Sequence, residues 1–501
     1  MSQKIEVFFP ALERNVLASK GDNLLTVIRG AGIGISAECG GVGRCGKCRV
    51  VIDGKPALAC LTYVMQSITV ELPKGDQEVE YDILLDSDNV ETHTLGHDSR
   101  DGSDGQESYA IAVDIGTTTV VAKLLNRTSG KELASFAELN AQLSFGSDVL
   151  SRINASLDDS SELSELIISQ IDRAIATMLE EQSLSAAQID RVVLAGNTTM
   201  TYILLGLPCR SLGFVPFEPA FDYPLCQTYQ EIFKTSTLEC NVIVLPYISA
   251  YVGGDLTAGL IARLGDEDFI LMDMGTNGEL IYKKGERLVC TATAAGPAFE
   301  GGNIECGTGS MRGAISSVSY ENGSFVLTTI GNAPPIGICG SGILDLMAVL
   351  LEENYLDDTG LFADSVPDGR IILYSDPKDS TKEVYFSQKD VRQFQLAKSA
   401  VRTGLEIISE EMGGDSPAQV FLAGGFGQNL DPSSAIAIGM LPEEFEGIVL
   451  PIGNSSLSGA VKIALDDSLI DSIIKVAAQG EEINLAAHKR FNDLFMEYMY
   501  F

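Results

Sequence analysis

Four cysteines near the start of the chain have a spacing that suits a metal cluster. Residues 39–48 read CGGVGRCGKC, and a fourth cysteine follows after eleven intervening residues. Four thiolates are what a [2Fe–2S] cluster needs, and the intervening glycines let the loop wrap closely around it. Zinc prefers two separated Cys-x2-Cys pairs, whereas three of these cysteines share one loop. The spacing therefore predicts a [2Fe–2S] cluster held by Cys39, Cys45, Cys48 and Cys60.

Two Gly-Thr turns that directly follow apolar strands have the composition of phosphate-binding loops. One begins at Asp114, after an expected strand at 110–113, and the other begins at Asp273, after an expected strand at 269–272. In such a turn the glycine lets the backbone approach an anion, and N–H groups and threonine hydroxyls donate to it. The two aspartates are candidates for holding Mg²⁺ through water or for orienting an attacking water. The residues expected to cradle phosphates are Gly116, Thr117, Thr118, Gly275, Thr276 and Asn277.

A third glycine-rich loop follows an expected strand at 420–422. Its glycines, Gly424, Gly425 and Gly427, would let a flat nucleoside lie against the backbone. Asp255 follows two further glycines, and two interpretations of it stay open. Its carboxylate is either catalytic or a simple cap for the helix that starts near Leu256.

The elements around these motifs divide the chain into different kinds of structure. Expected strands at 3–9, 48–53 and 68–72, with a helix capped by Asp22, suffice for an α+β β-grasp domain over residues 1–85. Residues 86–108 are rich in Asp, Ser and Gly and predict a flexible linker. From residue 109, strands that end in glycine-rich turns alternate with helices, such as an amphipathic one at 161–182, and indicate an α/β architecture.

The composition restricts the cellular setting and the partners. With 501 residues and a formal charge of −35, the chain should repel nucleic acid and anionic membrane surfaces. It contains no apolar run long enough to span a bilayer, and its start lacks the pattern of a signal peptide, so we expect a cytoplasmic protein. The other six cysteines have no ligand spacing and are expected to be free thiols.

Taken together, the three loops resemble those of the superfamily of sugar kinases, heat-shock ATPases and actin. With the N-terminal cluster domain, the chain resembles the reductive activators of corrinoid proteins over nearly its whole length. The segments that carry the resemblance are AGNTTM at 195–200, GGD at 253–255, GPAFEGG at 296–302, GICGSG at 337–342 and the closing segment 491–501.

The resemblance implies an actin-like two-lobed ATPase fold, with a first lobe at 109–245 and a second lobe and C-terminal segment at 246–501. It also implies an iron–sulfur enzyme that uses ATP and Mg²⁺ to reduce the Co(II) of a corrinoid protein to Co(I), for a methyltransferase system. A low-potential electron donor would supply the electron. The chain looks short for this family, with little room for a separate middle domain.

Three other functions stay open at this point. The first is an ATP-dependent small-molecule kinase with an appended redox domain, and the second is a redox chaperone that binds a corrinoid protein without ATP turnover. An activator of a radical dehydratase ranks lower, because such activators hold their cluster between two subunits. The sequence leaves open the methyl donor, the physiological reductant, the cluster potential, whether ATP is hydrolysed or only bound, and whether the chain forms a homodimer.

Overall fold

The computed structural model describes most of the chain. The described residues are 4–12, 14–31, 33, 35, 48–72, 107–146, 148–157, 160–275, 277–377 and 379–501. Cys39, Cys45, Thr276 and most of the expected linker at 86–108 lie outside them. Within these ranges, no helix combines the length and the hydrophobicity that crossing a membrane requires.

The N-terminal domain is a five-stranded sheet packed on one helix. The sheet has the order β2-β1-β5-β3-β4, with β1 and β5 parallel. Buried and exposed residues alternate along β1, so that one face packs on Leu24, Leu25 and Ile28 of α1. This arrangement confirms the predicted β-grasp domain. Its elements are β1 (Lys4–Phe9), β2 (Arg14–Ser19), α1 (Leu24–Gly30), β3 (Arg49–Ile52), β4 (Lys55–Leu58) and β5 (Ile68–Glu71).

The cap of α1 differs from the prediction. The side chain of Asn23, not Asp22, accepts from the helix: its Oδ1 lies 3.0 Å from the N–H of Leu25. Asp22 instead accepts from the N–H of Ser19, at 2.6 Å, and so closes the preceding turn. Both aspartate and asparagine suit a helix cap and a turn. The sequence alone therefore does not show which of these two neighbouring residues caps the helix.

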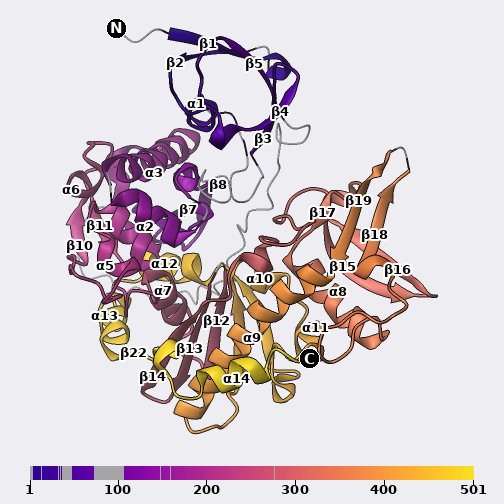
Figure 1. Ribbon diagram of the computed structural model, residues 1–501. Helices are drawn as coiled ribbons and strands as arrows, with labels where there is room; N and C mark the ends of the chain where they lie inside the picture. Colours follow the sequence, from indigo (N-terminus) through magenta and orange to yellow (C-terminus); the bar gives the residue numbers. More distant parts are fainter. Residues whose placement is uncertain are drawn as a thin grey trace.

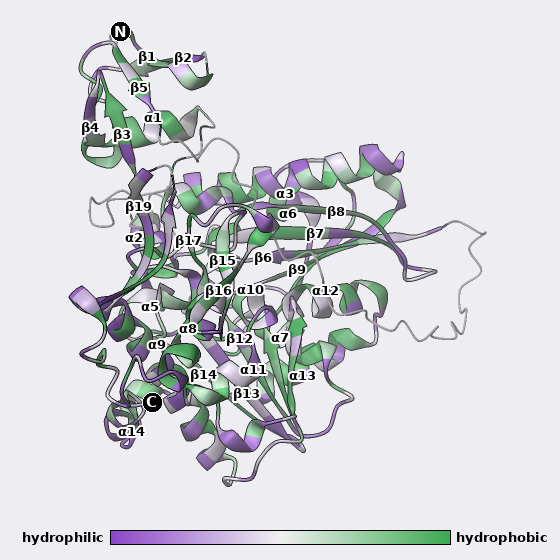
Figure 2. Ribbon diagram, turned by 90° about the vertical axis from the view of Figure 1, so that its right-hand side faces the viewer, coloured by the Kyte–Doolittle hydropathy of each residue, from purple (hydrophilic) through white to green (hydrophobic). Residues whose placement is uncertain are grey.

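The first large sheet has six strands in the order β10-β11-β9-β6-β7-β8. Its strands are β6 (Tyr109–Ile115), β7 (Thr119–Asn126), β8 (Glu132–Leu139), β9 (Ile189–Gly196), β10 (Cys226–Thr228) and β11 (Asn241–Val244). Its helices are α2 (Val149–Ser156), α3 (Ser161–Gln182), α4 (Thr198–Leu204), α5 (Arg210–Gly213) and α6 (Tyr229–Phe233). All residues of β6 are buried, and Figure 2 shows the central strands mostly in the hydrophobic colour.

The second large sheet has the order β21-β20-β12-β13-β14-β22. Its strands are β12 (Phe269–Met274), β13 (Gly278–Lys284), β14 (Arg287–Thr293), β20 (Gln419–Ala423), β21 (Val449–Gly453) and β22 (Glu481–Glu482). The associated helices are α9 (Gln388–Glu411), α10 (Gly424–Gln428), α11 (Pro432–Ala437), α13 (Leu469–Gln479) and α14 (Phe491–Glu497). Beside this sheet lie α8 (Gly340–Glu352), β15 (Ala314–Glu321), β16 (Ser324–Thr329) and β17 (Gly337–Ile338), and the hairpin of β18 (Arg370–Asp376) and β19 (Asp379–Ser387) (Figure 1).

The two large sheets repeat one topology. In each, three antiparallel strands form a meander (β6-β7-β8 and β12-β13-β14), and two further strands add in parallel beside the first of them (β9 and β11, β20 and β21). The predicted phosphate turns occupy the equivalent β6–β7 and β12–β13 connections. This duplication confirms the predicted two-lobed actin-like fold.

Two helices, α7 (Gly254–Ala262) and α12 (Ser455–Leu465), join the sheets (Figure 1). On α7, Leu256 and Leu260 pack with buried residues of the second sheet, whereas Ala258 and Ile261 pack with those of the first. Helix α12 follows a strand of the second sheet but contributes its apolar residues to the core of the first. Parallel strands end at one edge of their sheet, so the predicted loops meet near the N-termini of these helices.

Candidate functional site

Two of the four predicted cluster ligands lie side by side in the N-terminal domain. The sulfur atoms of Cys48 and Cys60 are 3.2 Å apart, both residues are buried, and neither is in a disulfide. A disulfide bond would need about 2.05 Å, so the two sulfurs are not bonded to each other and lie close enough to bind one iron after a small movement. The backbone fixes the pair, because the N–H of Ala59 donates to the Cys48 carbonyl at 2.8 Å. Cys39 and Cys45 lie outside the described residues.

The first predicted phosphate loop, Gly116–Thr118, is held from behind by two asparagines. Asn140 donates its side-chain amide to the Gly116 carbonyl at 2.8 Å and its backbone N–H to the Thr118 carbonyl at 2.9 Å. Asn197 donates its side-chain amide to the Thr117 hydroxyl oxygen at 3.1 Å. The sequence indicated neither contact, although Asn197 lies in one of the segments that carry the resemblance. The loop is therefore a fixed element and not an open turn.

Asp114, the residue before the last of β6, is bound by two groups from the other lobe. Its carboxylate accepts from the Asn454 amide at 2.8 Å and from the Ser456 hydroxyl at 2.7 Å. Asn454 also caps α12, because its Oδ1 accepts from the N–H of Leu457 at 2.8 Å. Burial raises the pKa of Asp114, and the two hydrogen bonds lower it again. The sequence analysis missed both donors, although an asparagine between a strand and a helix is a recognisable cap.

Three more carboxylates belong to the same charged group as Asp114: those of Asp255, Asp273 and Glu279. Burial and the charges of Asp273 and Asp114 raise the pKa of Asp255 to about 7. Burial and the charge of Asp114 raise the pKa of Asp273 to about 7, whereas burial and the charges of Asp273 and Asp255 raise the pKa of Glu279 well above its usual value. Glu279 was not predicted. Because neighbouring members of this group oppose one another's ionisation, a cation bound here would stabilise their charged forms.

The two interpretations of Asp255 are both compatible with its position. Its Oδ1 accepts from the N–H of Leu256 at 2.8 Å, within the first turn of α7, while the N-cap position belongs to Gly253. The carboxylate thus supports the helix and at the same time faces the other acids. In the part of the chain that the structure describes, no three His, Cys, Asp or Glu side chains are arranged as a ready-made metal site.

The loops after β12 and β20 touch each other. Gly424 has φ +83°, and a Cβ there would lie 2.6 Å from a carboxylate oxygen of Asp273. A Cβ on Gly425 would meet nothing within 4 Å, so this glycine borders open space, whereas Gly427 is buried against Leu422. In the second phosphate loop, the N–H of Gly275 donates to the Asn277 carbonyl at 3.0 Å, and Thr276 lies outside the described residues.

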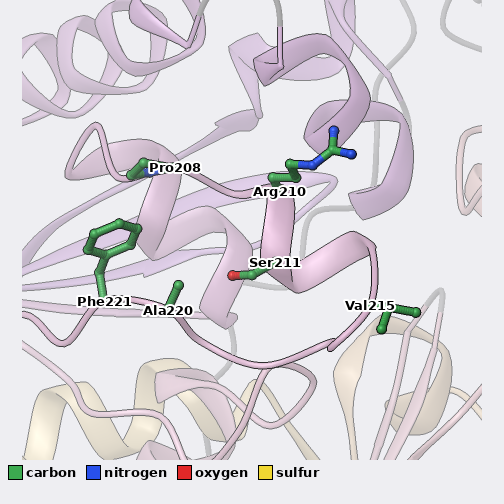
Figure 3. Close-up of a pocket in the computed structure, with 6 residues that line it drawn as sticks. All are labelled: Pro208, Arg210, Ser211, Val215, Ala220 and Phe221. Atoms are coloured by element: carbon green, nitrogen blue, oxygen red, sulfur yellow. The ribbon is translucent and has the colours of Figure 1, made fainter.

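A separate hollow of about 200 Å³ lies on the first lobe (Figure 3). In the figure, the guanidinium of Arg210 points away from the neighbouring Ser211. No predicted site residue lines the hollow, so it is no part of the sites described above. Its lining residues are Pro208, Arg210, Ser211, Val215, Ala220 and Phe221.

Comparison with protein families assigns each of these parts. A model of the 2Fe-2S iron-sulfur cluster binding domain matches residues 11–65. A model of the RACo middle region matches residues 109–265, and a model of the C-terminal domain of RACo, the ASKHA domain, matches residues 267–501. The chain belongs to the family of corrinoid reductive activators. Its N-terminal part is thus a [2Fe–2S] domain. The match of its C-terminal part to an ASKHA domain supports ATP binding by this chain.

Individual relatives match most or nearly all of the chain. The corrinoid activation enzyme RamQ of Eubacterium limosum is 28% identical, with 98% of each chain covered. The [Co(II) methylated amine-specific corrinoid protein] reductase of Methanosarcina barkeri is 22% identical over 77% of this chain and 76% of its own. A solved structure titled reductive activator for corrinoid, iron-sulfur protein superposes with a TM-score of 0.68 at 27% identity, covering 99% of this chain and 98% of the other.

One expectation from the sequence is wrong. The chain was expected to leave little room for a middle domain, but the middle-region model matches residues 109–265. That region is the six-stranded sheet from β6 to β11 together with α7, which the sequence analysis assigned mainly to the first lobe. The proposed boundaries at 85, 108 and 245 stay predictions.

Proposed function

We propose that this protein is an enzyme that reduces the Co(II) of a corrinoid protein to Co(I), using ATP and one electron that passes through its [2Fe–2S] domain. The observation that carries the proposal is the combination, in one chain, of a cluster-binding domain with both regions of a corrinoid activator. The relatives named as a corrinoid activation enzyme and a corrinoid protein reductase support the choice of substrate.

In this proposal, Cys39, Cys45, Cys48 and Cys60 hold the cluster. The short distance between the sulfurs of Cys48 and Cys60 supports the assignment for that pair. A [2Fe–2S] cluster supplies one-electron transfer at low potential. Each turnover moves one electron to cobalt, and a low-potential electron donor restores it.

We assign ATP to the junction of the two large sheets, where these carboxylates lie. In this assignment, Asp114, Asp255 and Asp273 would hold Mg²⁺ through water or orient the attacking water. The cation would neutralise phosphate charge and offset the repulsion between the carboxylates. The phosphate-binding residues are Gly116, Thr117, Thr118, Gly275, Thr276 and Asn277, and those facing the nucleoside are Gly424, Gly425 and Gly427.

The nucleotide supplies the energy that electron transfer to a low-potential cobalt requires. Moving one electron uphill by 100 mV costs about 2.3 kcal/mol. Hydrolysis of ATP to ADP and phosphate exceeds that cost if it is coupled to a change in the cobalt's surroundings. Helices α7 and α12 lie at the junction of the two lobes. Asp255 is at the N-terminal end of α7, and Ser456, which donates to Asp114, is at the N-terminal end of α12. The two helices are therefore suited to convert nucleotide binding into lobe movement.

The partners in this proposal are a corrinoid protein of a methyltransferase system and the electron donor. Nucleic acid and membranes are not among them, because the charge of −35 repels both kinds of phosphate-bearing surface. We place the reaction in the cytoplasm, where free cysteines such as those of the described part of the chain stay reduced. A homodimer is compatible with these roles.

The deciding experiment follows Co(I) directly. The purified protein is chemically reduced without oxygen, mixed with a Co(II) corrinoid protein, and monitored at the Co(I) absorbance with ATP, with a non-hydrolysable analogue, and without nucleotide. We expect Co(I) only with ATP. No Co(I) in any of the three mixtures would overturn the proposal. A kinase would consume ATP with a small acceptor whether or not corrinoid is present, and a chaperone would bind the corrinoid protein without releasing phosphate.

A further inference from the structure

Hydrogen bonds to three carbonyl groups fix the orientation of the backbone in the first phosphate loop. The carbonyl oxygens of Gly116 and Thr118 accept from Asn140, and that of Thr117 accepts from the guanidinium of Arg152. All three acceptors therefore point into the lobe. In a trans peptide the C=O of one residue and the N–H of the next point in opposite directions. The N–H groups of Thr117 and Thr118 consequently point out of the lobe.

Arg152, on α2, is a charged group with unusual surroundings. Its side chain is completely buried, and it is among the largest fully buried side chains of the described residues. Besides the Thr117 carbonyl, it donates to the Gly146 carbonyl at 3.0 Å and to the Gln142 amide oxygen at 3.2 Å. It also contacts the sulfur of Met200 at 3.0 Å. These four acceptors are all neutral.

A buried guanidinium without a bound carboxylate is costly to maintain, so its position calls for a reason. Burial lowers the pKa of Arg152 to about 10, although the nearby charge of Asp148 opposes that shift, and the group stays charged at neutral pH. Its positive charge lies directly behind the loop, in a chain whose cleft otherwise presents four carboxylates. The rigid fork of an arginine donates from three separate nitrogens, here to three different oxygens, whereas a lysine donates from a single nitrogen.

We propose that Arg152 is a positioning residue for nucleotide phosphate: it holds the Thr117 carbonyl inward, so that the adjacent N–H groups face the phosphates, and it places a positive charge behind them. The inference rests on the proposed use of ATP by this cleft. It assigns Arg152 no contact with the substrate, because the loop lies between the guanidinium and the cleft.

The test compares ATP with adenosine, which shares the nucleoside but lacks the phosphates. Binding of each to the full-length protein is measured by calorimetry for the wild type, Arg152→Gln and Arg152→Lys. We expect both variants to lose about tenfold or more in ATP affinity and to keep their adenosine affinity within about twofold. Lysine keeps the charge but lacks the planar fork of three donating nitrogens, so its loss reports on the held carbonyl.

Arg173→Gln is the matched control, since Arg173 is an exposed arginine of α3 paired with Glu138 at 2.7 Å. It should leave both affinities unchanged. Equal losses for ATP and adenosine in the Arg152 variants would mean a merely structural role and overturn the inference, as would unchanged ATP binding. If Arg152→Gln does not fold, the same two titrations on Arg152→Lys decide. A wild type that binds no ATP would instead refute the proposed function itself.

Discussion

The hydrogen bond between Ser456 and Asp114 allows a stability prediction that depends on pH. The Ser456→Ala variant removes a donor 2.7 Å from a carboxylate that is only 8% exposed, so water cannot fully replace it. Losing a hydrogen bond to a buried charged group costs about 1.5–3 kcal/mol. We expect that loss in the free energy of unfolding at pH 8 without nucleotide.

The sign of the pH effect follows from the charge state of Asp114. Burial raises its pKa, and the bond from Ser456 lowers it, so the serine favours the ionised form. Without the serine, the folded-state pKa moves further above the unfolded value. The variant therefore loses most stability at high pH, and its deficit shrinks toward about 1 kcal/mol as the pH falls through that folded-state pKa.

Urea unfolding at pH 8 and pH 5.5 measures both quantities. Ser458→Ala is the matched control, because Ser458 is buried in the same helix and donates at 3.0 Å to a neutral acceptor, the Asn454 carbonyl. Its deficit should be the same at both pH values. If the stability loss of Ser456→Ala does not change with pH, or equals that of the control at both pH values, Asp114 is not an ionised group that Ser456 binds from the other lobe.

Three further predictions concern the cluster, the third loop and the acidic cleft. Cys60→Ser should abolish iron binding and the visible absorbance of the cluster, whereas Cys226→Ser, at an exposed cysteine, should retain both; equal iron contents would contradict the assignment. Gly424→Ala should destabilise the fold by at least about 1 kcal/mol because φ is +83°, and Gly425→Ala, with no atom within 4 Å of the added Cβ, should have little effect on the urea midpoint. The folded-state pKa of Asp255, about 7 against an ordinary 3.8, means that stability falls as pH rises from about 4 to 7, by roughly 1.4 kcal/mol per pH unit at most; Asp255→Asn should flatten that slope in thermal melts, and an unchanged slope would exclude it as the source.

Some features were predictable because they depend on residue types that lie close together in the sequence. The cysteine spacing indicated a cluster, and the helix predicted at 161–182 has those same bounds in the structure, since an apolar stripe marks its length. The two glycine-threonine turns were recognised because each follows an apolar strand, and they occupy equivalent positions in two sheets of the same strand order. Short edge strands such as β2 and β4 went unpredicted, because their alternation is brief and weak.

The site residues that went unpredicted are common types whose position depends on distant contacts. Ser456 meets Asp114 across 342 residues of chain, and Arg152 meets the Thr117 carbonyl across 35. A serine in a helix or an arginine on an amphipathic segment is ordinarily exposed and indicates no site. Glu279 likewise belongs to an unremarkable strand, and only the folded cleft brings its charge near those of the aspartates.

The crossing of α7 and α12 explains why the cleft and the lobe junction form one unit. A Cβ on Gly459 would lie 1.9 Å from the Ala258 carbonyl oxygen, so the two helices touch backbone to backbone. The N-terminal end of α7 carries Asp255, and that of α12 carries Ser456, which holds Asp114 from the other lobe. Because the two helices pack so tightly, a change in the spacing between these carboxylates is expected to shift one lobe against the other. In the proposed function, a nucleotide and its cation would act on these charges, which would link nucleotide binding to the relative position of the lobes.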